Sequence, residues 1–171
     1  GDVDASGADL SRAILDGTQA ESITLSEAVL SNASLPDATL TGAVLSGVSA
    51  SGATLAGSRL VGATLPDGDF SGSKLAETDL TDVTAKTATF TGATLEGATL
   101  TDGFFEESTL ADCDLREAVC TGVAFTDAVL DGATLHNATL TGADLTGSSF
   151  RSATAPASDL SESTLTGAEF T

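Results

Sequence analysis

The sequence has no tryptophan, tyrosine or methionine, and its seven phenylalanines are only 4% of the chain. An ordinary globular core depends on such large side chains, so the interior must be built from smaller ones. Basic residues are also scarce: six Lys and Arg stand against 25 Asp and Glu, giving a formal net charge of −19. Direct binding of nucleic-acid phosphates needs a basic surface and is therefore excluded. No apolar run approaches the roughly 18 residues that suggest a membrane span, so we expect no membrane insertion.

The sequence repeats with a period of five from end to end. Every fifth position from Ala5 to Phe170 is apolar, and these 34 positions hold 22 Leu, six Phe, five Ala and one Cys. Two residues before each lies a second set of 34, from Val3 to Ala168, made of small or β-branched residues. None of the 31 charged residues falls in either set. Two columns therefore face inward and three face outward, a pattern that fits neither a helix nor a long strand.

Turn-forming residues mark where the chain changes direction. Of the 18 glycines, 15 stand two positions after the Leu/Phe column, as do both asparagines, Asn32 and Asn137. The three prolines, Pro36, Pro66 and Pro156, stand one position after it. A type II turn favours Pro at its second residue and Gly or Asn at its third, where φ is positive. The pattern predicts a corner across the two residues that follow each Leu or Phe.

The six inward phenylalanines indicate how many corners close one coil. They form three pairs, each joining position n to position n+20: Phe70 with Phe90, Phe105 with Phe125, and Phe150 with Phe170. If four repeats make one coil, the two rings of each pair stack between neighbouring coils. Gly68 and Gly103 precede the first ring of two pairs and make room for it. We therefore expect four sides per coil and about 8.5 coils at the roughly 4.8 Å spacing of paired strands.

The repeats resemble those of the pentapeptide-repeat family. Stretches such as Ala98-Thr99-Leu100-Thr101-Asp102 and Ala138-Thr139-Leu140-Thr141-Gly142 match its pattern of a small residue, Asp or Asn, Leu or Phe, and two variable positions. Thr often replaces the Asp, which remains in only some repeats, for example at Asp9, Asp79, Asp114, Asp144 and Asp159. The resemblance implies an all-β fold, a right-handed quadrilateral parallel β-helix. We expect residues 1–171 to form one such domain, without helical caps at its ends.

No set of residues indicates catalysis. The single histidine, His136, lies in an outward column, where a convex rod offers no cleft for a general base. Glu106-Glu107 and Asp112-Asp114 are weak candidates for binding Ca²⁺, because the glycine-rich calcium repeat is absent. Phe104 is the only aromatic residue in an outward column, and we assign it no role because single exposed apolar residues are common. We predict that the protein is not an enzyme and has no catalytic, cofactor-binding or metal-binding residues.

The two cysteines occupy inward columns. Cys120 is expected between Leu100 and Leu140, and Cys113 between Ala93 and Ala133, on a different side of the coil. We interpret both as buried thiols that pack as small apolar residues. The alternatives are a disulfide or a metal site, but a zinc site needs four converging ligands.

These features favour a non-catalytic structural or protein-interaction rod. The repeats continue to both ends, so we expect exposed coil ends that bind a protein partner, stack on a second copy, or continue in a longer chain. One alternative is implied by the resemblance: some pentapeptide-repeat proteins mimic DNA and bind a type II topoisomerase (gyrase). A second alternative is ice or mineral binding by threonine pairs such as Thr39/Thr41, Thr99/Thr101 and Thr139/Thr141. Arg59, Asp79 and Asp159 interrupt that ladder.

Overall fold

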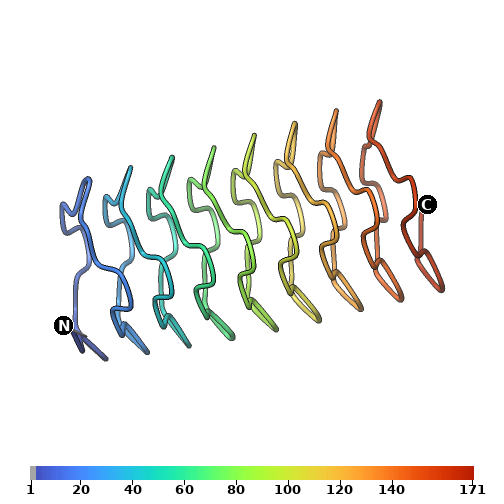
Figure 1. Ribbon diagram of the computed structural model, residues 1–171. Coiled ribbons are helices and arrows are strands. Elements are labelled where there is room, and N and C mark those ends of the chain that lie inside the picture. Colours follow the sequence, from blue (N-terminus) through green and yellow to red (C-terminus); the bar gives the residue numbers. More distant parts are fainter. Residues whose placement is uncertain (1–2) are drawn as a thin grey trace.

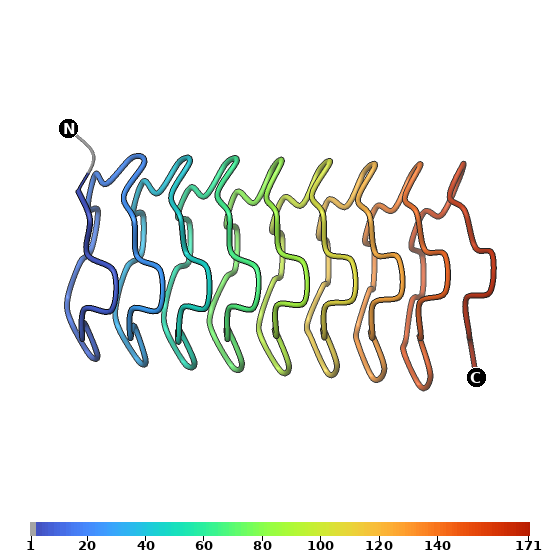
Figure 2. The same cartoon turned by 90° about the horizontal axis from the view of Figure 1, so that it is seen from below.

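The computed structural model describes residues 3–171 as a rod of stacked four-sided coils, with the two ends of the chain at opposite ends of the rod (Figures 1 and 2). This is the predicted right-handed quadrilateral β-helix. No helix occurs within the described residues, terminal coils included. Each side contributes one bridging residue, at positions 4, 9, 14 and so on to 169, instead of an extended strand. Residues 1–2 of the predicted domain lie outside the described part.

The register between coils is the same along the whole rod. Thirty parallel bridges join residue n to residue n+20, from Asp4–Thr24 to Ser149–Glu169. The backbone bonds around each bridge repeat: Leu25 N donates to Val44 O of the next coil at 2.7 Å, and Val44 N donates to Ile23 O of the coil before at 2.9 Å. Because the ladder satisfies these buried polar groups without any side chain, the outward residues are free to vary.

The corners lie where the sequence predicts them. The second residue after the Leu/Phe column has a positive φ at every repeat from Gly7 to Gly167. The turn is closed by a hydrogen bond such as that from Ala43 N to Leu40 O, at 3.0 Å. Only the third turn residue has a positive φ, which is the arrangement of a type II turn. Fifteen of these positions hold glycine and 18 hold another residue, so side chains adopt the left-handed conformation at more than half of the corners.

The core is a column of small and large side chains along the rod axis. Every residue of both inward columns is buried between Leu25 and Phe150. In the end coils the same columns open to solvent: Leu165 is 44% exposed and Phe170 is 54% exposed. Each repeat therefore buries its apolar side chains only against the coils on either side of it, as in other solenoids.

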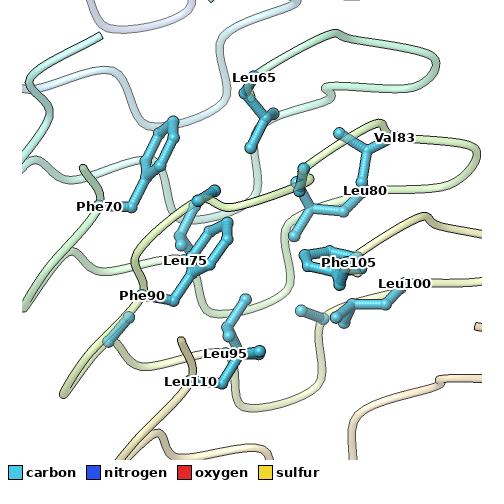
Figure 3. Packing of buried hydrophobic residues seen from close by; sticks show 14 of the residues in the cluster. Leu65, Phe70, Leu75, Leu80, Val83, Phe90, Leu95, Leu100, Phe105 and Leu110 are labelled. Carbon is cyan, nitrogen blue, oxygen red and sulfur yellow. The ribbon is translucent and has the colours of Figure 1, made fainter. Parts of the chain in front are cut away.

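All three predicted phenylalanine pairs are in contact, two of them stacked and one tilted, and Figure 3 shows the rings of Phe70 and Phe90. Phe70 and Phe90 stack at 5.2 Å between centroids and 11°, Phe150 and Phe170 at 4.9 Å and 4°, and the Phe105–Phe125 pair is tilted by 50° at 5.5 Å. A further contact, Phe90–Phe105 at 5.7 Å, joins two of the pairs into one run of four rings.

The role of the two inward glycines also agrees with the prediction. A Cβ atom at Gly68 would lie 2.8 Å from Cε2 of Phe70, and one at Gly103 would lie 2.8 Å from Cε2 of Phe105. Such distances are well inside van der Waals contact, so only glycine leaves space for the ring two residues on.

Candidate interaction surface

The three outward columns carry all the charged side chains of the described chain. No pocket is present among residues 3–171, and no group of three or more Asp, Glu, His or Cys side chains is placed to hold a metal ion. No helix of this part of the chain is long and apolar enough to cross a bilayer. What the molecule presents to other molecules is therefore its convex surface of corners and flat sides.

Seven aspartates stabilise the corners instead of facing a ligand. The first of the two corner residues donates no backbone hydrogen bond to a carbonyl at any described corner, which is why proline is tolerated there. Where Asp stands directly before the Leu/Phe column, its Oδ1 accepts a hydrogen bond from the backbone amide of this first corner residue. Thr146 N, for example, donates to Asp144 Oδ1 at 3.0 Å and Thr146 Oγ1 donates to the same atom at 2.6 Å. The aspartates that bond in this way are Asp4, Asp9, Asp69, Asp79, Asp114, Asp144 and Asp159.

These bonds lower several carboxyl pKa values. The hydroxyl and amide of Thr146 hold the pKa of Asp144 below its ordinary value of 3.8. At Asp114 the main cause of the lowered pKa is the Arg116 guanidinium, which also bonds Glu96 at 3.0 Å. Both carboxylates are therefore charged at neutral pH and engaged within the rod.

Two of the four sequence candidates for metal binding are engaged in ion pairs. Glu107 forms an ion pair with Lys86 at 3.0 Å, whereas Glu106 has no ion pair among the described residues. Asp112 lies at a corner and Asp114 pairs with Arg116 Nη2 at 2.6 Å.

The threonine pairs do not form an unbroken ladder either. On their side of the rod, Arg59 and Asp79 form an ion pair at 3.8 Å across neighbouring coils. This charged pair interrupts the run of threonines, as the sequence predicts.

His136 and the two cysteines lie where the sequence predicts. His136 is exposed at the first of two corner residues. Cys113 and Cys120 are free and buried, and burial raises the pKa of each thiol to about 12. Cys113 Sγ donates a hydrogen bond to Phe90 O at 2.8 Å. A thiol that stays protonated is a poor nucleophile and a poor metal ligand.

Two large apolar side chains stand out on the inner coils. Phe104 is 48% exposed and Val119 is 38% exposed. Phe104 bridges Thr84 and Ala124, and Val119 bridges Thr99 and Thr139. The sequence identifies Phe104 as outward-facing, but only the coil register shows that Val119 borders the same corner.

A family model described as pentapeptide repeats matches in eight copies, over residues 23–62, 68–106, 88–118, 108–147 and 143–171. The chain belongs to the pentapeptide-repeat family. Comparison with curated proteins gives no match.

Solved structures of other pentapeptide-repeat proteins have the same fold. HetL, involved in heterocyst differentiation regulation in the cyanobacterium Nostoc sp. strain PCC 7120, is 29% identical, with a TM-score of 0.95 over 96% of this chain and 75% of that one. A trypsin-treated form of QnrB1, a plasmid-mediated fluoroquinolone resistance protein, is 18% identical, with a TM-score of 0.60 over 100% of this chain and 92% of that one. At that identity the second likeness shows the fold alone.

Proposed function

We propose that this pentapeptide-repeat chain is a non-catalytic interaction rod that binds a protein partner through its outward side chains. The observation that carries this proposal is the division between an interior of Leu, Phe and Ala and a surface of the described chain that holds the charges and has no pocket. The likeness to HetL, a protein involved in regulation, supports a role that depends on binding rather than on turnover. A net charge of −19 favours a partner with a basic surface.

Self-association is a second way in which the rod can act. In the described chain the coils at both ends expose apolar side chains, with Val3 58%, Leu165 44% and Phe170 54% exposed. Unpaired backbone groups at such an end form a template for a further coil. In our proposal that coil belongs to a second copy of the protein or, in a longer chain, to the same protein.

The test is affinity enrichment on the purified rod, followed by calorimetry with each recovered protein in pure form. We expect saturable binding that weakens as salt rises. Neutralising outward carboxylates should weaken it, whereas an inward Leu→Ile substitution, which keeps the surface, should not.

The other outcomes separate the alternatives. Recovery of a type II topoisomerase, with inhibition of its supercoiling activity, would instead establish DNA mimicry. If sedimentation finds only copies of the rod bound to each other, self-association is the function. The proposal fails if no recovered protein binds in pure form and the rod stays monomeric.

A further inference from the structure

Phe104 and Val119 border the same corner of the rod. They are the exposed large apolar side chains of the described coils between Leu25 and Phe150. Phe104 follows the corner at residues 101–102, and Val119 precedes the corner at residues 121–122, one coil further on. Because residue n lies beside residue n+20, both corners belong to one edge of the rod. We call this edge, with the side chains of Phe104, Val119 and Ala124 and the corners between them, the Phe104 edge.

The fold does not require an aromatic residue at this position. The neighbours of Phe104 along the side are Thr84 and Ala124, and the ring that fills the core comes from Phe105. The backbone at Phe104 is fully paired, since its amide donates to Val83 O at 2.8 Å and its carbonyl accepts from Ala85 N at 2.7 Å. A partner at this edge therefore contacts side chains and cannot add a strand here.

The charges on the two sides that meet at this edge are unbalanced. The side that contains Phe104 consists of residues 3–7 and the equivalent segment of every coil, and it holds seven carboxylates against one base, Lys86. The side that contains Val119 consists of residues 18–22 and their equivalents, and it holds six carboxylates against one base, Arg59.

The other two sides are less negative. On one of them, Arg12 and Arg151 offset five carboxylates, which leaves a net charge of −3. On the other, Lys74 and Arg116 offset six carboxylates, which leaves a net charge of −4. The two sides that meet at the Phe104 edge carry −6 and −5. The edge thus lies between the two most negative sides.

The one basic residue on the side that contains Phe104 already forms an ion pair. Lys86 Nζ pairs with Glu107 at 3.0 Å, while Glu106, two residues from Phe104 and at the next corner of the same side, has no ion pair among the described residues. An exposed aromatic face beside free carboxylates suits a guanidinium, which stacks on rings and pairs with carboxylates in the plane of its fork. A nucleic acid would be repelled by the same charges.

We propose that the Phe104 edge docks an arginine-bearing segment of a protein partner, with a guanidinium stacked on the Phe104 ring and flanking carboxylates paired to further basic residues. This inference rests on the proposed interaction function and assigns it a place on the rod. Val119 and Ala124 supply the apolar surface beneath the stems of the basic side chains, which bury their methylene groups while the charged heads reach the carboxylates.

The experiment uses a fluorescent peptide of alternating arginine and serine, with lysine–serine and glutamate–serine peptides for comparison, and measures binding by anisotropy at low salt. Phe104→Thr, which installs the residue found at Thr84, should weaken arginine-peptide binding about tenfold, the size of a well-formed cation–π contact. Glu106→Gln should weaken it severalfold. Glu21→Gln, the same change at the first residue of a corner about four coils away along the rod, is the matched control and should have little effect because of that distance. The lysine peptide should bind less tightly, and the glutamate peptide should not bind.

Three outcomes overturn the proposal: no binding of the arginine peptide, unchanged binding by Phe104→Thr, or equal losses for Glu106→Gln and Glu21→Gln. The last two outcomes would mean that the diffuse negative charge of the rod alone attracts the peptide. Unchanged thermal unfolding of the Phe104→Thr rod shows that the substitution acts on binding and not on folding. If a recovered partner binds wild type and Phe104→Thr equally well, the interaction function stands and only its placement at this edge fails.

Discussion

Single residues at the corners are constrained by the residue one coil away. Where Asp or Asn occupies the positive-φ position n and glycine stands at n+20, the Oδ1 atom lies in the space that a Cβ atom would take at the glycine. A Cβ at Gly132 would lie 2.3 Å from Asp112 Oδ1, whereas a Cβ at Gly142 would meet nothing within 4 Å. The corner glycines thus serve two purposes, a permitted backbone conformation and room for a neighbouring carboxylate or amide. The pairs that show this contact are Asn32/Gly52, Asp37/Gly57, Asp102/Gly122, Asp112/Gly132 and Asp127/Gly147.

Substitution of two glycines separates these purposes. Gly132 and Gly142 have nearly equal φ values, 72° and 69°, so alanine should cost both corners about 1 kcal/mol of unfolding free energy through backbone strain. Gly132→Ala should lower the free energy of unfolding by about 0.5–1 kcal/mol more than Gly142→Ala, because the Asp112 carboxylate must move. Denaturant unfolding measures both losses. In the double variant Asp112→Ala/Gly132→Ala the extra loss should disappear, and equal losses for the two single variants would contradict this account.

Sequence reasoning recovers the corner residues but not their contacts. The position of 15 glycines and both asparagines two residues after the Leu/Phe column predicts the positive φ correctly. The fit of Asp112 beneath Gly132 depends on side-chain orientation across two coils. Its signal, Asp or Asn at n with Gly at n+20, becomes visible in the sequence only after the register between coils is known.

The turn is the element that the Asp residues stabilise. At each described corner, the backbone amide of the first corner residue donates to no carbonyl of the ladder. Where an aspartate stands two residues earlier, its carboxylate accepts a hydrogen bond from this amide. The sequence predicts the location and type of the turn from Pro and Gly, and misses this bond because Thr stands before Leu in many repeats. The ring contacts in the core are also only partly predictable. The three Phe pairs follow from the spacing of residues along one side, whereas the Phe90–Phe105 contact joins two different sides of the coil and cannot be predicted from that spacing.

The pH dependence of stability tests the turn bond at Asp144. Its pKa is below 3.8 in the folded chain, so the carboxylate stabilises the fold fully above that ordinary value, and the stabilisation is lost as the pH falls through the lower folded value. Because the group is well solvated, we expect about 0.5 kcal/mol. Thermal unfolding of wild type and Asp144→Ala should therefore differ at neutral pH and converge in acid. Asp144→Asn keeps an uncharged oxygen acceptor and serves as the control, with a smaller loss that does not vary with pH. A constant difference between wild type and Asp144→Ala would show that the carboxylate charge plays no part.

At the scale of the whole molecule, the stacking that builds the core also stacks the charges. Neighbouring coils are about 4.8 Å apart, so like charges at n and n+20, such as Asp82 and Asp102, stand well within the screening distance of about 8–10 Å at ordinary salt. The net charge and the outward columns are visible directly in the sequence, while the placement of Phe104 and Val119 at one edge between the two most negative sides also requires the n to n+20 register, which the structure confirms.

The rod should consequently be more stable in salt. With a net charge of −19, raising sodium chloride from very low to molar concentration should increase the midpoint of thermal unfolding, because screening weakens repulsion in the folded chain more than in the expanded one. Chloride is the suitable anion, since sulfate strengthens apolar burial by itself. Potassium chloride should give the same increase, which separates screening from specific binding of sodium. A midpoint that stays flat across the series would mean that the stacked carboxylates are too well solvated to repel one another. The net charge would then bear on the choice of partner alone, and the stability of the rod would rest on its core and backbone ladder.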